Sequence, residues 1–203
     1  MISKWILASN NPGKVKEFNR FFRNYLEFET IESKGIQSPQ EPHKTFVENA
    51  IEKARNTARI SGSPTIADDS GLIVDFLSGL PGVRSARFAT SSNSIKANQD
   101  KQNMDLLLEL MTAVTEESQR TCRFVCVIVA LRCADDPDPI ISHGVWEGRL
   151  NFEPKGTEGF GYDPIFYDPK IKKTAAQITL EEKSKWSHRA KALRKIFKAL
   201  IRQ

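Results

Sequence analysis

The chain has 203 residues, a formal net charge of +5 at pH 7, and 39% hydrophobic and 27% charged residues. This composition excludes a disordered chain, and the length suits one substantial domain rather than two large ones. No apolar run approaches the roughly 18 to 20 residues of a membrane helix, and the start lacks a cleavable signal, so we expect a cytoplasmic protein.

Apolar runs alternate with helical patterns along the chain, which is typical of an α/β protein. The pattern predicts a last helix after residue 190, with its lysines and arginines facing solvent. In chain order before it, the pattern predicts a strand at 5–9, helices at 12–25 and 45–60, strands at 64–68 and 72–76, a helix at 94–114, and strands at 121–132 and 140–150 that form a hairpin.

A polar strand-to-helix turn, SNNPGK, lies near the N-terminus. Gly13 allows a close approach and Lys14 enters the helix start, where backbone N–H groups bind phosphate and a lysine adds charge. The stretch matches neither the P-loop nor the Rossmann fingerprint. A capped helix with Pro12 in its first turn explains the same residues, so the turn alone leaves both interpretations open.

The stretch TIADDSGLIVD places two adjacent carboxylates in an otherwise apolar strand. Burying a carboxylate costs several kcal/mol unless it is paired. Mg²⁺ is bound by one or two carboxylates together with substrate phosphates, so Asp68 and Asp69, with Glu41 and Lys53 upstream, predict a metal and triphosphate site. Because side chains alternate along a strand, we expect one acid to bind the metal and the other to support it.

Glycines surround two aromatic residues in the stretch KGTEGFGYDP. Phe160 and Tyr162 could present a ring that stacks on a base, a contact worth about 1 to 3 kcal/mol in single-stranded nucleic acids, and Asp163 could accept a hydrogen bond. Hydrophobic packing of the loop is the alternative.

The three cysteines lie in or beside the apolar run at 124–131. Small buried thiols are the usual explanation for such positions. A zinc site of Cys122, Cys126 and His143 would lack a clear fourth ligand.

Six stretches, in one order over almost the whole chain, resemble the inosine triphosphate pyrophosphatase family: SNNPGKVKE, TFVENAIEKA, IADDSGL, PGVRSARFA, GFGYDPIF and EEKSKWSHR. The resemblance implies an elongated mixed α/β sheet with flanking helices and two lobes around a central cleft, in a single catalytic domain over residues 1–203 that usually forms a homodimer. It also implies Mg²⁺-dependent hydrolysis of ITP, dITP and XTP to the nucleoside monophosphate and pyrophosphate.

The resemblance further implies roles for single residues. Glu41 and Asp69 match the metal site, and Asp69 also matches the proposed proton acceptor. Asp68 and Lys53 match supporting catalytic positions. The positions that match substrate contacts are Ser9, Asn10, Asn11, Pro12, Gly13 and Lys14 at the phosphates, Ser70 after the acid pair, Phe160, Gly161, Tyr162 and Asp163 at the base, and Lys183, His188 and Arg189.

Two other classes of function fit part of the sequence. A nucleic-acid-binding module would use the basic C-terminal residues and the two aromatic rings, but it leaves the acid pair without a role. A phosphatase that releases orthophosphate would differ only in the bond that breaks. We expect a nucleotide substrate, and neither nucleic acid nor a membrane as partner.

Overall fold

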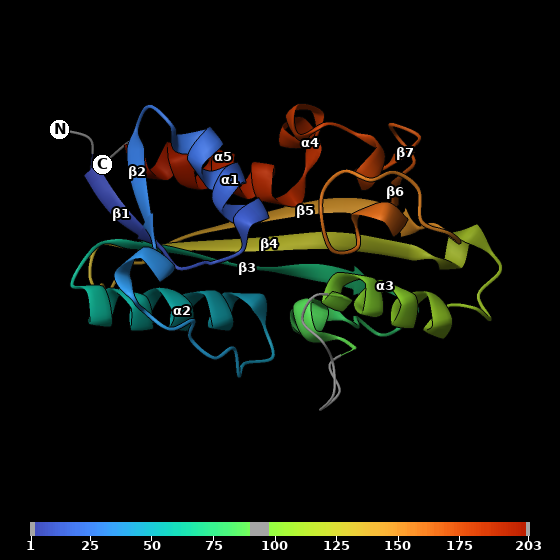
Figure 1. The fold of residues 1–203 in the computed structure, drawn as a ribbon, viewed down its shortest axis with the longest axis horizontal. Helices are drawn as coiled ribbons and strands as arrows, with labels where there is room; N and C mark the ends of the chain where they lie inside the picture. The colour runs from blue at the N-terminus through green and yellow to red at the C-terminus, as the bar shows by residue number, and fades with distance from the viewer. Residues whose placement is uncertain (1–2, 90–97, 202–203) are drawn as a thin grey trace. The chain divides into compact units, whose positions relative to one another are not determined.

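The computed structural model describes residues 3–89 and 98–201. Within these residues, seven strands form one sheet in the order β2-β1-β3-β4-β5-β6-β7, flanked by helices (Figure 1). The sheet is mixed, because β1 pairs in parallel with β2 and β3 whereas β6 pairs antiparallel with β5 and β7. The predicted fold class, a mixed α/β sheet with flanking helices, is confirmed; the central cleft stays a prediction.

The strands and helices have the following bounds: β1 Ser3–Leu7, α1 Pro12–Phe22, β2 Leu26–Thr30, α2 Phe46–Ser61, β3 Thr65–Val74, α3 Gln99–Leu110, β4 Thr121–Leu131, β5 Ile140–Leu150, β6 Phe166–Asp168, β7 Lys173–Thr174, α4 Leu180–Trp186 and α5 His188–Ile201. Among the described residues, no helix combines the length and the apolarity that a membrane span requires.

The chain divides into two compact units. Unit 1 comprises Met1–Asp69, Cys126–Gly144 and Arg189–Gln203, and unit 2 comprises Ser70–Val125 and Val145–His188. The division falls within β3, directly after the acid pair, so both aspartates belong to unit 1.

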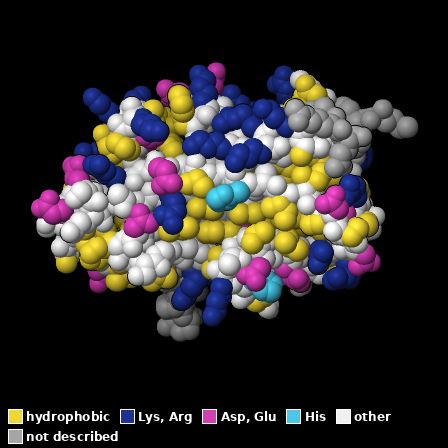
Figure 2. All heavy atoms as spheres, turned by 180° about the vertical axis from the view of Figure 1, so that it is seen from behind, with side chains coloured by type: hydrophobic (Ala, Val, Ile, Leu, Met, Phe, Trp, Pro, Cys, Tyr) yellow, Lys and Arg dark blue, Asp and Glu magenta, His cyan; other side chains and the backbone are white. Residues whose placement is uncertain are grey.

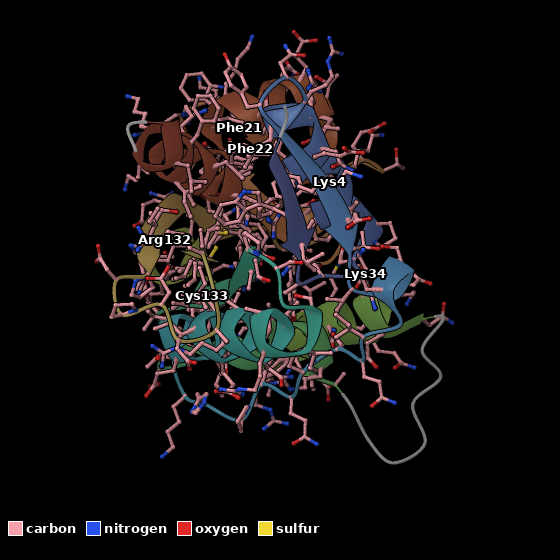
Figure 3. All side chains as sticks on the ribbon, turned by 90° about the vertical axis from the view of Figure 1, so that its left-hand side faces the viewer. Lys4, Phe21, Phe22, Lys34, Arg132 and Cys133 are labelled. Atoms are coloured by element: carbon pink, nitrogen blue, oxygen red, sulfur yellow. The ribbon has the colours of Figure 1, made fainter. Side chains whose placement is uncertain are left out.

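Two apolar cores hold unit 1 together. Helices α1 and α5 cover one face of its strands, and α2 covers the other (Figure 1). Phe21 and Phe22 point from α1 toward α5 (Figure 3), and each ring centroid lies 5.6 Å from that of Phe197. The first core contains Phe18, Phe22, Ile66 and Leu193, and the second contains Ile6, Ala50, Ala54 and Val129.

Local signals in the sequence account for the helix ends in unit 1. Asn11 caps α1 by accepting a hydrogen bond from the Lys14 N–H at 3.2 Å, and Pro12 occupies the first turn. Helix α2 ends at Ser61 and is followed by the capping residue Gly62, whose φ of 64° suits a glycine. In α5, Leu193 is buried and Lys195 is exposed, as the helical spacing predicts.

The predicted break between two strands at 64–68 and 72–76 is wrong, because β3 runs without interruption through the acid pair. Gly71 marks a close approach rather than a turn. A Cβ atom there would clash with both the Gly82 carbonyl oxygen and the Ser85 Oγ. The Ser85 hydroxyl also accepts a hydrogen bond from the Leu72 N–H at 2.9 Å, which fixes this part of the strand.

Other predicted bounds also need correction. Helix α1 ends at Phe22 instead of residue 25, and α3 covers only 99–110 of the predicted 94–114, of which 94–97 lie outside the described residues. The predicted hairpin is confirmed, since β4 and β5 are consecutive and adjacent in the sheet. The sequence reasoning missed β2, β6, β7 and α4, which are all short.

In unit 2, the buried side chain of Arg120 binds backbone carbonyl groups from two elements. One set directly follows α3 and the other lies at the end of β5, so a single guanidinium connects these two segments. The acceptors are the carbonyl oxygens of Met111 at 2.9 Å, Val114 at 2.8 Å, Leu150 at 2.9 Å and Asn151 at 3.2 Å.

Arg120→Met is expected to lower the free energy of unfolding by about 3 kcal/mol, because it leaves buried carbonyl groups without donors. Urea unfolding measures the change. Arg123→Met is the matched control, since Arg123 lies three residues after Arg120, on β4, but pairs with Asp75 at a partly exposed site. Such surface pairs contribute at most about 1 kcal/mol. Equal destabilisation by both substitutions would contradict the role given to Arg120.

Candidate active site

Asp68 is completely buried in unit 1 and contacts two cations. Its Oδ2 lies 2.9 Å from the Lys14 Nζ and accepts a hydrogen bond from the Arg189 Nε at 3.4 Å. Arg189 in turn donates from Nη1 to Glu17 Oε2 at 2.7 Å. Burial opposes ionisation of Asp68, but Lys14, Arg189 and Lys53 hold its pKa well below the usual range. Asp68 therefore stays ionised and is a poor proton acceptor.

Asp69 contacts α2, whereas Asp68 contacts α1 and α5, as strand alternation predicts. Its Oδ2 accepts a hydrogen bond from Asn49 Nδ2 at 3.1 Å. Burial raises the pKa of Asp69 to about 6, since Lys53 and Lys14 offset burial only in part and Glu41 raises it further. The adjacent aspartates thus have opposite pKa shifts, which is the pattern expected when two acids take different roles.

Glu41 and Lys53 form a largely buried ion pair next to Asp69. The Lys53 Nζ donates to Glu41 Oε1 at 2.9 Å. Burial disfavours the ammonium, but Asp68, Glu41 and Asp69 together raise the pKa of Lys53, so its charge is retained. Lysine and carboxylates therefore share one small region of unit 1.

Two carboxylates in this region fit a hard divalent cation. Within residues 3–89 and 98–201, no three or more His, Cys, Asp or Glu side chains gather into a metal-binding group. Mg²⁺ needs only one or two protein carboxylates when substrate phosphates and water complete its coordination. Glu41 raises the pKa of Asp69, which shows that the two carboxylates repel each other. A bound cation would reduce this repulsion. The donor set of Glu41 and Asp69 therefore suits Mg²⁺.

The turn from Ser9 to Lys14 is organised by its own polar side chains. The Ser9 Oγ accepts from the Asn11 N–H at 3.3 Å, and the Asn10 Oδ1 accepts from the Glu32 N–H at 3.1 Å. The helix-cap interpretation of Asn11 and Pro12 is confirmed. Phosphate binding by the turn stays a prediction, as it does for Gly13 in the first turn of α1.

In unit 2, the loop that carries Phe160 and Tyr162, the two residues predicted to stack on a base, exposes only one of the two rings to solvent. Tyr162 is 4% exposed and its hydroxyl donates to the Ser85 carbonyl at 2.9 Å, so its ring packs in the core and is not available for stacking. Phe160 is partly exposed. Asp163 accepts from the Phe160 N–H at 2.9 Å and pairs with Lys183, whose Nζ lies 5.1 Å from the Phe160 ring centroid.

The remaining predicted contacts divide between the units. The His188 ring stacks on Phe124 in unit 2, with centroids 4.8 Å apart and planes 17° apart. Arg189 belongs to unit 1, where its side chain is 2% exposed and binds Glu17 and Asp68. Ser70, which is partly exposed, begins the unit 2 part of β3. Direct nucleotide contacts by these residues stay predictions.

Three partners of the site residues, Glu17, Asn49 and Ser85, lie within the family motifs but were given no role from the sequence. Glu17 and Lys14 are three residues apart on α1, and Asn49 and Lys53 are four apart on α2, so each pair shares one helix face. This spacing is the signal that could have identified Glu17 and Asn49. Ser85 had no such signal, because its partners come from distant elements.

The model of the Ham1 family matches residues 5–199, and the chain belongs to this family. A dITP/XTP pyrophosphatase of Pectobacterium atrosepticum is 48% identical over 200 residues, 98% of each chain. A protein of the same name from Escherichia coli K12 is 46% identical with the same coverage. The solved structure of a HAM1 protein from Coxiella burnetii superposes with a TM-score of 0.89 at 39% identity and covers 100% of each chain. The predicted family resemblance is confirmed.

Proposed function

We propose that this protein is a nucleoside triphosphate pyrophosphatase that hydrolyses ITP, dITP and XTP, with Mg²⁺ as cofactor, to the nucleoside monophosphate and pyrophosphate. Its relatives named dITP/XTP pyrophosphatase match nearly their whole length. The observation that carries the proposal is the difference in contacts and pKa between the two adjacent acids. Asp68 is held ionised by Lys14 and Arg189, whereas Asp69, beside Glu41, keeps a raised pKa.

Electrostatic stabilisation comes from the cations around the pair. A triphosphate brings about four negative charges, and charge develops on the departing pyrophosphate as the bond to the α-phosphorus breaks. Lys14 and Lys53 would lie against this charge. Glu41 and Asp69 would hold Mg²⁺, which when bound supplies further positive charge to the phosphates.

Asp69 is the acid suited to orient the attacking water and accept its proton, because Asp68 is already bound by Lys14 and Arg189. The raised pKa of Asp69 belongs to the metal-free site, since bound Mg²⁺ would lower it. Attack in line at the α-phosphorus then releases pyrophosphate and leaves the monophosphate. Asp68 positions Lys14 and takes no proton.

Residues of unit 2 would recognise the base. The Phe160 ring would stack on the purine, while Asp163 and Lys183 fix the loop around it. The side chain of Arg189 is bound to Glu17 and Asp68, so we assign the donor to the 6-oxo group of the purine to His188 or to nearby backbone N–H groups.

We also propose that the 203 residues act as one catalytic domain and form a homodimer in the cytoplasm. Apolar side chains gather on the face seen in Figure 2, and apolar surface that gathers on one face is typical of an interface between subunits. The three cysteines are free, which suits a reducing compartment.

Pyrophosphate release tests the proposed function. Purified protein is incubated with ITP and Mg²⁺, and pyrophosphate and orthophosphate are measured separately, with EDTA as the metal-free control. Pyrophosphate and inosine monophosphate in equal amounts are expected, and EDTA should abolish their formation. Orthophosphate as the direct product, or undiminished activity in EDTA, would contradict the proposal.

Lys14→Ala and Lys53→Ala are each expected to lower kcat/KM by a similar factor, about tenfold or more, for every triphosphate tested, because the phosphates are common to all nucleotides. The ratio of kcat/KM for ITP to that for ATP should remain unchanged. Lys16→Ala is a suitable control, since Lys16 is exposed on the same helix as Lys14. A mutant with a strongly altered ITP to ATP ratio would place that lysine at the base instead.

A further inference from the structure

The start of α3 contacts the loop that carries Phe160, although none of the six family motifs includes α3. Asp100, in the first turn of α3, accepts a hydrogen bond through Oδ2 from the Gly161 N–H at 2.9 Å. Gly161 has a φ of 62° and directly follows Phe160 in the chain. A carboxylate from another element therefore holds the backbone next to the ring that we assign to base stacking.

A second contact joins α3 to the same loop through one shared carbonyl group. The Ser85 carbonyl oxygen accepts from the Tyr162 hydroxyl at 2.9 Å and from Asn103 Nδ2 at 3.2 Å. Asn103 is buried, lies one turn after Asp100 in α3, and accepts from the Ala89 N–H at 2.8 Å. The first half of α3 thus anchors the loop both at Gly161 and, through Ser85, at Tyr162.

The third anchor lies within the loop itself. Asp163 accepts from the Phe160 N–H and pairs with Lys183. A Cβ atom at Gly159 would clash with Asp163 Oδ2, so the chain must have glycine there for this carboxylate to reach the loop backbone. Asp163 and Tyr162 are buried, whereas Asp100 is exposed. Asp100 is therefore the anchor that can be removed with the least disturbance to the core of unit 2.

We propose that Asp100 is a positioning residue that fixes the Phe160 loop and thereby contributes to purine selectivity, an inference that rests on the proposed function. A loop that is held before the substrate arrives loses less conformational entropy when it binds the base. Removing the anchor makes binding of the preferred base less favourable. Groups that act on the phosphates belong to unit 1 and are not part of this contact.

The test compares Asp100→Ala with Asp105→Ala and Asp100→Asn. Asp105 is an exposed aspartate on the same helix that pairs with Lys101 instead of the loop, so its removal changes the charge equally. Asp100→Ala is expected to raise KM for ITP about five- to tenfold, to leave kcat within about twofold, and to lower the ITP to ATP ratio of kcat/KM. Asp105→Ala should behave as the wild type. An asparagine side chain retains an acceptor oxygen, so Asp100→Asn should restore most of the loss.

Binding of inosine monophosphate, measured by calorimetry, gives a second readout that needs no turnover. Its Kd should rise several-fold in Asp100→Ala and stay unchanged in Asp105→Ala. Equal Kd values for these two variants would overturn the role of Asp100, as would an equal fall of kcat for all nucleotides or an Asp100→Asn variant as defective as Asp100→Ala. Failure of the wild type to hydrolyse ITP would overturn the proposed function instead, and the Kd comparison would still decide the role of Asp100.

Discussion

Asp69→Asn is expected to lower kcat for ITP at least about a hundredfold while the protein stays folded. The substitution removes one charge from the proposed metal site and the proton acceptor with it, and losing one preorganised electrostatic group typically costs about 10² to 10³ in rate. Volume hardly changes, and the asparagine can still accept the hydrogen bond from Asn49. Steady-state kinetics with saturating Mg²⁺ measure kcat, and circular dichroism shows whether the variant is folded.

The same substitution is expected to stabilise the metal-free protein at neutral pH. The pKa of Asp69 is raised to about 6, so the folded state binds a proton more tightly than the unfolded state. The ionised group therefore destabilises the fold fully above about pH 6, and this penalty disappears as the pH falls toward the unfolded pKa near 4. A shift of about two pKa units corresponds to about 3 kcal/mol at pH 8. Thermal unfolding in EDTA at pH 8 and pH 4.5 measures the difference.

Asp68→Asn provides the contrast, because the pKa of Asp68 is lowered instead of raised. Its ionised form contributes stability that is present above the ordinary aspartate pKa and is lost only in stronger acid. Removing the Asp68 charge takes one carboxylate partner from the buried Arg189 and leaves Glu17 in place. The free energy of unfolding should therefore fall by about 3 kcal/mol or more at neutral pH. Its rate should fall less than that of Asp69→Asn. Equal or greater loss of rate in a folded Asp68→Asn variant would reverse the roles given to the two acids.

ITP and XTP are expected to be hydrolysed on the order of 10⁴-fold more efficiently than ATP. These purines carry a 6-oxo acceptor where adenine carries a 6-amino donor, so a site with buried donors would leave polar groups unpaired with ATP. Discrimination by shape alone reaches only roughly 10- to 200-fold. The comparison of kcat/KM for both nucleotides in one enzyme preparation measures this ratio.

GTP separates recognition of the 6-oxo group from recognition of the rest of the base. It shares the 6-oxo group with ITP and differs by the 2-amino group, so its rejection needs a further steric or polar penalty near the Phe160 loop. A kcat/KM for GTP between those of ITP and ATP is expected. Equal kcat/KM for ITP and ATP would contradict the base-selective account even if pyrophosphate were the product.

Long periodic segments and paired charges were the predictable part of this molecule. The apolar stripe of α2 and the β-branched run of β4 gave reliable signals, and the cost of burying Asp68 and Asp69 predicted that cations would lie nearby. Lys14 and Lys53 meet that requirement. By contrast, the predicted break between strands at 64–68 and 72–76 is wrong, because Gly71 makes room for the Gly82 backbone within a continuous strand.

Contacts between distant segments were not predictable from spacing. Glu17 and Arg189 are 172 positions apart, and Asp100 and Gly161 are 61 apart, so neither pair produces a local pattern. The burial of Tyr162 was missed for a similar reason. Its hydroxyl finds a partner at Ser85, 77 positions away, which allows the ring to pack in the core.

Hydrolysis in ¹⁸O-labelled water tests most directly the central claim that water attacks the α-phosphorus. The protein is incubated with ITP and Mg²⁺ in H₂¹⁸O, and the inosine monophosphate and pyrophosphate are separated and analysed by mass spectrometry. The account predicts one ¹⁸O atom in the monophosphate and none in the pyrophosphate. Label in the pyrophosphate, or labelled orthophosphate with unlabelled inosine diphosphate, would contradict it.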